Sequence, residues 1–168
     1  VRPISKDEQP YEKKLLVMQP GETLLSTNKL EVNNSAFWRE YDIANETPTN
    51  LAATLVIDNF ISQPFYNEMR TKQQLGYIVW GGASRKQDRL QAYFIIQSGT
   101  HPANELKDRA DAFLATLPEK FKSLTSEEFD RLKTAAREKI KEKPKSIAEK
   151  AGILFARAYD HEGDFDRE

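Results

Sequence analysis

One stretch in the middle of the chain, residues 65–80, constrains the fold most because its character changes from helical to extended at a single glycine. The residues from Glu68 to Leu75 are mostly good helix formers, whereas Tyr77 opens a run of aromatic and β-branched residues that is typical of a strand. Gly76 is the first residue able to adopt a left-handed conformation at little cost, so it is predicted to end the helix at Leu75. The sequence therefore predicts a helix and a strand that meet at Gly76, which would act as a structural hinge.

Two side chains beside this junction carry hydrogen-bond donors on rigid elements. Arg70 lies in the last turns of the predicted helix and Tyr77 at the start of the strand. A guanidinium and a phenol are suited to gripping a carbonyl oxygen, and they bind it more strongly as that oxygen gains negative charge. Spacing alone leaves a simpler interpretation open, in which Arg70 interacts with the helix dipole and water, and Tyr77 packs its ring.

The run from Arg70 to Tyr77 resembles the Arg-Thr-x-x-Gln-Leu-Gly-Tyr signature in the C-terminal half of the insulysin/pitrilysin family of zinc metallopeptidases, the inverzincins. Residues 94–98 (Phe-Ile-Ile-Gln-Ser) and 165–167 (Phe-Asp-Arg) also resemble that family, and the resemblance covers about residues 30–168. It is a resemblance to the fourth, non-catalytic domain and not to the zinc-carrying first domain. It implies an α+β fold of the type found in LuxS and mitochondrial processing peptidase.

The resemblance also implies an auxiliary role in proteolysis. In these peptidases two halves close around a peptide, and zinc in the N-terminal half activates water. By motif, Arg70 and Tyr77 would hydrogen-bond the substrate near the scissile bond, while Gly76 would serve the geometry. The expected partners are a peptide substrate and the remaining domains of the parent peptidase.

The chain does not contain the family's catalytic signature, His-x-x-Glu-His. It has two histidines, His101 and His161, which lie far apart and outside that pattern, and no cysteine. We therefore expect no metal and no other cofactor in this chain, with zinc in the N-terminal domain of the parent. The chain alone is expected not to be an enzyme, whereas the parent is expected to be a zinc metalloendopeptidase.

The charge balance argues against nucleic acid and membrane partners. The formal net charge is −1, from 25 basic and 26 acidic residues, so no long-range field attracts polyanions. The basic residues of segment 127–145 alternate with acidic ones, which indicates a solvated helix face. No apolar run is long enough to span a membrane. A soluble protein is expected, and the cytoplasm and the periplasm both fit.

The chain is expected to comprise a polar tether, residues 1–14, and one α+β domain, residues 15–168. Because it begins at Val1 without an initiator methionine and ends in Asp-Arg-Glu, we expect an excised or processed piece. The family resemblance implies that the chain stops before the family domain's final strand.

The predicted elements give an antiparallel sheet backed by helices. A helix starts at Thr47-Pro48 and is separated by Pro64 from the helix that ends at Leu75. Two further helices begin at capping boxes, at Thr125 and at Ser146. Strands are expected at 35–43, 77–80 and 90–97, and the last of them is expected to be central and covered on both faces. Short extended pieces are expected at 15–18, 24–25 and 30–32. A polar hairpin loop at 81–88 and a helix at 106–121 complete the prediction.

Three functions remain open on the sequence. The first is a non-catalytic domain of a zinc peptidase. The second is an assembly or interaction subunit of the same fold. The third is a stand-alone peptide-binding module, which would need an open groove beside residues 77–80. The first requires Arg70 and Tyr77 to face a shared chamber rather than a convex surface.

Overall fold

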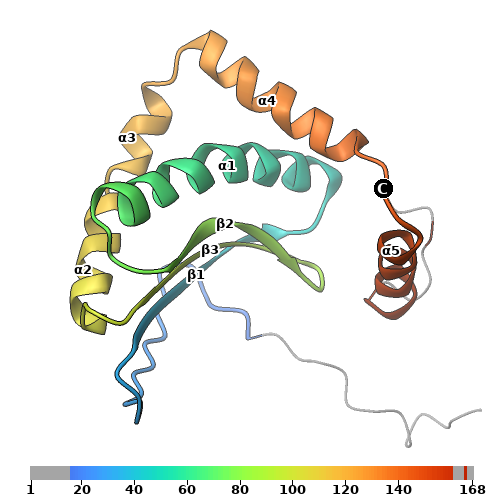
Figure 1. The fold of residues 1–168 in the computed structure, drawn as a ribbon. Coiled ribbons are helices and arrows are strands. Elements are labelled where there is room, and N and C mark those ends of the chain that lie inside the picture. The colour runs from blue at the N-terminus through green and yellow to red at the C-terminus, as the bar shows by residue number, and fades with distance from the viewer. Residues whose placement is uncertain (1–15, 161–164, 166–168) are drawn as a thin grey trace, which may run out of the picture.

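The computed structural model describes residues 16–160 and 165, and within them the chain forms one sheet with helices on one of its faces (Figure 1). The strands are β1 (Ser35–Asn45), β2 (Ile78–Lys86) and β3 (Arg89–Ser98). They form a three-stranded antiparallel sheet in the order β1-β3-β2. This confirms the predicted α+β class and the central position of β3.

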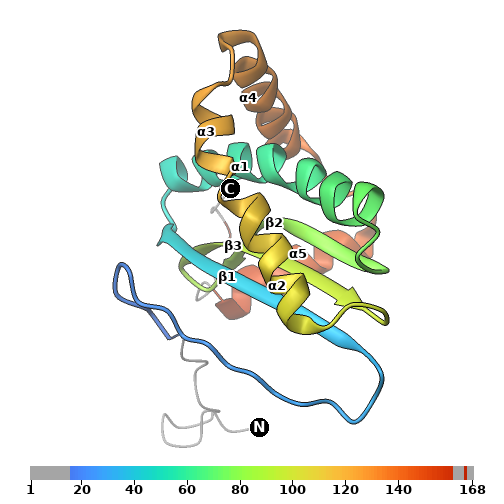
Figure 2. The same cartoon turned by 90° about the vertical axis from the view of Figure 1, so that its left-hand side faces the viewer.

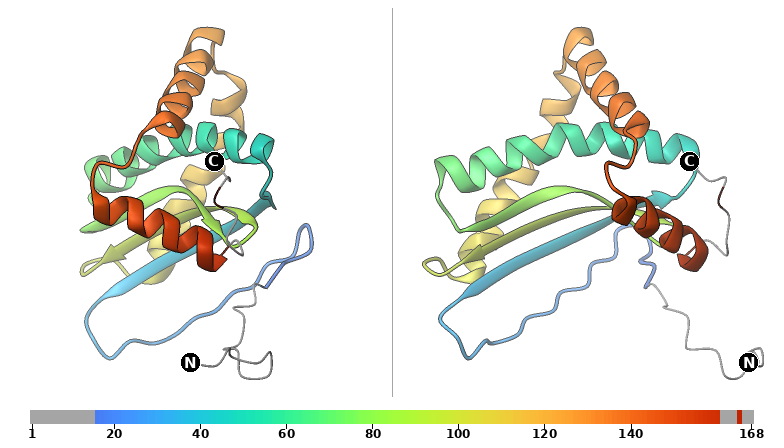
Figure 3. Two further views of the ribbon diagram at one scale, coloured as in Figure 1. Left: turned by 90° about the vertical axis from the view of Figure 1, so that its right-hand side faces the viewer. Right: turned by 45° about the vertical axis from the view of Figure 1, so that its right-hand side comes forward.

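The helices form two layers above the sheet. Helix α1 (Pro48–Tyr66) lies directly on the sheet and continues into the π-helical segment η2 (Asn67–Lys72). Helix α2 (Ala103–Leu114) and the short α3 (Leu117–Lys122) stand at one end of the sheet (Figure 2), and α4 (Ser126–Lys141) lies over α1. Helix α5 (Ile147–Asp160) lies at the end of the sheet where the β2–β3 hairpin turns (Figure 3).

One apolar core lies between α1, α2 and the sheet. Phe65 is fully buried at its centre, with its ring 5.0 Å from that of Phe94 and 5.5 Å from that of Phe113. The opposite face of β3 is less protected than the sequence predicts, because no described helix covers it. There Trp38 and Trp80 are 61% and 58% exposed.

The predicted helix break at Pro64 is wrong, because α1 runs through Pro64 to Tyr66. Proline removes one backbone donor and crowds the preceding turn. Continuing the helix, however, keeps Ile61, Phe65 and Met69 on one buried face. Burial of large apolar side chains gives about 1.5–3 kcal/mol each, which offsets the missing hydrogen bond.

The helix also ends before Leu75, and a left-handed glycine at position 76 is not the cause. The last π-helical residue is Lys72, and the left-handed residue that follows is Gln74, with φ 53°. Gly76 does not have a positive φ. A Cβ atom at Gly76 would lie 1.9 Å from the carbonyl oxygen of Gln97, so glycine is needed there because two backbones pass in contact.

Two further sequence predictions fail in the sheet. Strand β2 extends to Lys86, and the turn comprises only Gln87 and Asp88. Gly81 therefore lies inside the strand, where Phe65 of α1 packs against it. The predicted short extended pieces between residues 16 and 34 form no strand, and residue 15 lies outside the described residues.

The capping predictions fare better. The side chain of Thr47 accepts a hydrogen bond from Asn50 N–H at the start of α1, and both bonds of the Thr125–Glu128 capping box are present. Ser146 accepts from the N–H of Glu149, but that carboxylate accepts from Lys145 N–H instead of completing the box. The predicted helix 106–121 divides into α2 and α3 because Pro118 cannot continue a helix from α2.

Candidate functional site

Arg70 and Tyr77 lie together on the surface. The guanidinium of Arg70 donates a hydrogen bond to the carbonyl oxygen of Gly76 at 2.8 Å. Its central carbon lies 5.5 Å from the centroid of the Tyr77 ring, within the range of a cation–π interaction. The chain thus brings together the two donors that the sequence singles out.

Both groups remain available to a further molecule. Tyr77 is 85% exposed and Arg70 is half-buried. Among the described residues, no carboxylate forms an ion pair with Arg70, and no group forms a hydrogen bond with the Tyr77 hydroxyl. A guanidinium has five donors, and the bond to Gly76 uses one of them.

The local backbone explains why the pair is so placed. Leu75 is fully buried and donates its N–H to the carbonyl oxygen of Met69 at 3.0 Å, which closes the end of η2. Gly76 then lies against β3. Its carbonyl oxygen is the acceptor for Arg70, so the guanidinium is fixed by the same turn that begins the approach to β2.

The nearest acidic side chain in η2 is engaged elsewhere. Glu68 accepts hydrogen bonds from Lys72 at 3.0 Å and from Gln73 at 3.1 Å, and these bonds hold the pKa of Glu68 below its ordinary value. Arg109 of α2 donates to the side-chain oxygen of Gln73 at 3.2 Å. Glu68 therefore pairs with Lys72 and Gln73 and does not neutralise the charge of Arg70.

A groove of about 380 Å³ runs between α1 and β2. It was not identified from the sequence, because it depends on how α1 lies across the sheet. Five of its nine lining residues come from α1, three from β2 and one from β3. The lining residues are Asp58, Asn59, Ser62, Gln63, Tyr66, Val79, Trp80, Gly81 and Tyr93.

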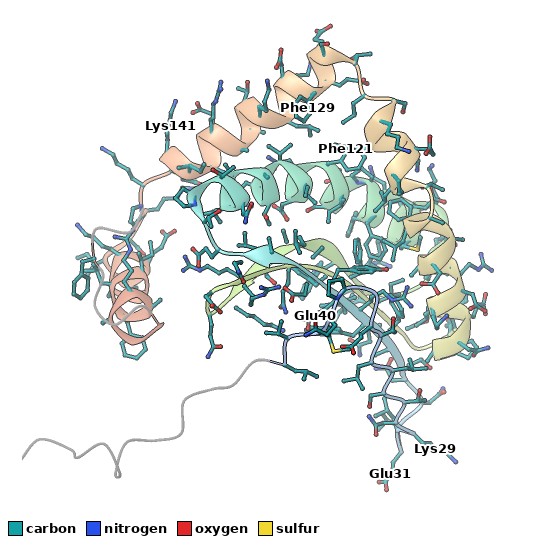
Figure 4. All side chains as sticks on the ribbon, turned by 180° about the vertical axis from the view of Figure 1, so that it is seen from behind. Lys29, Glu31, Glu40, Phe121, Phe129 and Lys141 are labelled. Atoms are coloured by element: carbon teal, nitrogen blue, oxygen red, sulfur yellow. The ribbon has the colours of Figure 1, made fainter. Side chains whose placement is uncertain are left out.

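A second, almost wholly apolar groove of about 360 Å³ lies between α1, α3 and α4. Phe121 and Phe129 lie at the corner where α3 meets α4 (Figure 4), with ring centroids 6.1 Å apart. Its charged lining residues are Lys133 and Arg137, and none of the candidate site residues predicted from the sequence lines it.

The described residues do not form a metal site. Within them, no group of three or more His, Cys, Asp or Glu side chains could hold a metal ion. His101 places its Nδ1 atom 2.9 Å from the Thr100 hydroxyl, and His161 lies outside the described residues. The described residues therefore do not fit a zinc ion.

The basic residues of α4 are largely paired. Arg131 and Lys133 form ion pairs with Glu127 and Asp130, both at 2.6 Å, and Lys139 pairs with Asp58 of α1 at 2.9 Å. This agrees with a solvated helix face. None of the described helices is both long and apolar enough to cross a bilayer.

Comparisons with known proteins agree with the fold. Residues 56–155 match the family model described as "PQQ synthase PqqF-like, C-terminal lobe domain 4". The chain belongs to this family. It is a C-terminal domain of an insulinase/pitrilysin-type peptidase, as the sequence resemblance predicts.

Relatives of the domain are much longer proteases. The chain is 34% identical over 120 residues to the insulin-degrading enzyme of Drosophila melanogaster, a match that covers 71% of this chain and 12% of that protein. It is 27% identical over 119 residues to protease 3 of Escherichia coli K12, again over 71% and 12%. The crystal structure of pitrilysin superimposes with a TM-score of 0.64 and 24% identity, over 78% of this chain and 14% of that one, which supports the fold.

Proposed function

We propose that this non-catalytic domain encloses and positions a peptide substrate opposite a zinc site in the N-terminal domain of a parent metalloendopeptidase. In this proposal residues 1–14 tether the domain, residues 15–168 form it, and its partners are the peptide and the parent's other domains. The supporting observation is that Arg70 and Tyr77 are adjacent and accessible, and that no carboxylate among the described residues pairs with Arg70.

The chemistry assigned to the two residues is hydrogen bonding near the scissile bond. The guanidinium and the phenol hydroxyl can both donate hydrogen bonds to a carbonyl oxygen. Their bonds strengthen as the carbonyl oxygen becomes an oxyanion, so they favour the transition state over the bound substrate. Zinc in the other domain would supply the activated water, which this domain does not need to provide.

The test is mutation in the parent enzyme. Arg70→Ala or Tyr77→Phe should lower kcat by about 10²–10³-fold, because each removes a donor to the developing oxyanion. Zinc content and thermal stability should stay unchanged. Arg109→Ala is the matched control, since it also removes an arginine beside η2 but not one in contact with Tyr77. Unchanged kinetics in both test variants would refute the assignment.

A second candidate is peptide binding without catalysis, and the groove between α1 and β2 favours it. In that case the domain would act as a stand-alone peptide-binding module, and Arg70→Ala would weaken its peptide binding. An assembly role would instead place Arg70 and Tyr77 in a subunit interface, and their substitution would dissociate the complex.

A further inference from the structure

Ser98 is a buried polar residue that the proposed function leaves without a role. It is 2% exposed, and it ends the segment 94–98 (Phe-Ile-Ile-Gln-Ser) that stands out in the sequence. A hydroxyl group in the interior costs free energy unless it is hydrogen-bonded. The partners of the Ser98 hydroxyl therefore indicate what this side chain holds in place.

The hydroxyl closes the turn that follows β3. The Oγ atom of Ser98 accepts hydrogen bonds from the N–H of His101 at 2.9 Å and from the N–H of Thr100 at 3.2 Å. It also lies 3.3 Å from the Thr100 hydroxyl oxygen and 3.4 Å from Nδ1 of His101. Serine commonly stabilises turns by such bonds to backbone N–H groups that follow it. One side chain thus fixes the path of the backbone from β3 toward α2.

The backbone of Ser98 is also held by the sheet. Ser98 pairs with Ser35 at the end of the ladder between β1 and β3. Loss of the hydroxyl would leave this ladder in place but would release the two N–H groups of the turn. The sheet should therefore persist in Ser98→Ala, while the turn at residues 98–101 should loosen.

The same turn lies against the junction between η2 and β2. A Cβ atom at Gly76 would lie 1.9 Å from the carbonyl oxygen of Gln97 and 3.4 Å from the Cα atom of Ser98. Pairing between β2 and β3 begins at Ile78 with Gln97, so Gly76 precedes the ladder. The backbone at residues 97–98 is thus the wall against which Gly76 packs.

The position of Gly76 determines where both proposed donors lie. Arg70 donates to the carbonyl oxygen of Gly76 at 2.8 Å. Tyr77 follows Gly76 directly, and its ring centroid lies 5.5 Å from the central carbon of the guanidinium. A displacement of Gly76 would therefore move both donors. A misplacement of catalytic groups by about 1 Å can lower a reaction rate by about 10²-fold.

We propose that Ser98 is a positioning residue for the Arg70–Tyr77 pair. Its hydroxyl holds the turn at residues 98–101, the turn holds the end of β3 against Gly76, and Gly76 holds the two donors. The proposal rests on the proposed function and adds to it a residue that acts only through others, since Ser98 is buried.

The first test is independent of enzymatic activity and uses amide hydrogen exchange, followed by NMR, in the 168-residue chain. The N–H of Leu75 donates to the carbonyl oxygen of Met69 at 3.0 Å and reports on the junction. Ser98→Ala should speed exchange at Leu75 about tenfold, because the wall behind Gly76 loosens. The N–H of Leu51, which bonds to Thr47 at 2.8 Å at the start of α1, is the control amide and should not change.

Two outcomes of the exchange experiment would overturn the proposal. Unchanged exchange at Leu75 would mean that the Ser98 hydroxyl does not hold the junction. An equal acceleration at Leu75 and Leu51 would mean that Ser98→Ala lowers the stability of the whole domain and has no local effect.

The second test measures kinetics in the parent enzyme. Ser98→Ala should lower kcat about tenfold and change KM less than about twofold, because displaced donors lose contacts that matter in the transition state. In an Arg70→Ala background, Ser98→Ala should lower kcat by less than about threefold, since its effect passes through the missing side chain. A full tenfold loss in that background would contradict the positioning role.

Conservative variants separate the hydrogen bonds from the volume of the side chain. Ser98→Thr keeps the hydroxyl and should restore kcat and the slow exchange. Ser98→Cys keeps nearly the same shape but accepts hydrogen bonds weakly, so it should behave like Ser98→Ala. The chain contains no cysteine with which the new thiol could form a disulfide. Native kinetics in Ser98→Cys would show that volume matters and the hydrogen bonds do not.

Thr54→Ala is the matched control, because Thr54 is another buried hydroxyl residue, 4% exposed. It precedes Arg70 by about 24 Å along the helix. Its kcat should be native even if its thermal stability falls, and a loss equal to that of Ser98→Ala would refute the proposal. If Arg70→Ala left kcat unchanged, the proposed function would fail, and the exchange experiment would still decide whether Ser98 holds the junction. If Arg70→Ala lowered kcat and Ser98→Ala did not, only the role of Ser98 would fail.

Discussion

At Gly76 the chain passes β3 so closely that a methyl group has no room. A Cβ atom there would lie 1.9 Å from the carbonyl oxygen and 2.8 Å from the carbonyl carbon of Gln97. Backbone atoms on a central strand cannot move aside easily, so Gly76→Ala should lower the free energy of unfolding by about 2–3 kcal/mol. Urea denaturation followed by circular dichroism measures this change.

Gly99→Ala provides the comparison at the same residue scale. A Cβ atom at Gly99 meets nothing within 4 Å, and its φ is not positive, so the substitution should change stability by less than about 0.5 kcal/mol. Equal effects at the two glycines would contradict the close approach of Gly76 to β3.

The sequence predicted that Arg70 and Tyr77 lie close together, but it gave the wrong reason for a glycine at position 76. Arg70 and Tyr77 meet because they flank a short turn, and that proximity follows from their spacing. Glycine, however, serves both left-handed backbone and close packing. Only the three-dimensional arrangement shows that Gln74 takes the left-handed conformation and that Gly76 accommodates β3.

At the scale of elements, Asp58 links α1 to β2 and α4. Burial alone would raise the pKa of its carboxyl group. The hydrogen bonds from Lys139 and from the N–H of Ala83 outweigh that effect and hold the pKa below its ordinary value of 3.8. Since the folded-state pKa is below that of the unfolded chain, the resulting stability is complete above about pH 4 and is lost as the pH falls through the folded-state pKa.

We therefore expect Asp58→Asn to flatten the acid limb of the stability profile. Unfolding free energies measured by urea titration between pH 7 and pH 2.5 should fall more steeply for the native chain than for this variant. Asp108→Asn is a suitable control, because the Asp108 side chain is 75% exposed. If Asp58→Asn reproduced the native acid limb, the carboxylate would not link the three elements.

Local sequence patterns correctly predicted where helices begin, but they did not predict which residues lie inside helices and strands. Thr47 and Thr125 cap helices through bonds within three residues, which sequence spacing specifies directly. Pro64 and Gly81 were read as interruptions, yet both lie inside regular elements. Tertiary packing decides these positions, since Phe65 must remain in the core next to Gly81.

At the scale of the whole molecule, alternating and helical periodicity correctly indicated one sheet backed by helices. The segment from residue 16 to 34 was predicted to contain short strands, but its apolar residues, Leu24, Leu25 and Leu30 among them, stay exposed and unpaired with the sheet. Short apolar runs form strands only when an edge or a second layer receives them, and a local pattern does not report on that partner.

The last prediction follows from how chemistry divides between this domain and its parent. In the proposed function the domain supplies hydrogen-bond donors for an oxyanion, while its sequence contains no His-x-x-Glu-His motif and no cysteine nucleophile. The chain alone should therefore hydrolyse no peptide, with or without added Zn²⁺.

A parent enzyme deleted for this domain should be inactive and should regain chelator-sensitive cleavage when the chain is added in trans. Arg70→Ala in the added chain should not restore activity, whereas Arg109→Ala should. Chelator-sensitive hydrolysis by the chain alone would instead place a complete active site within it.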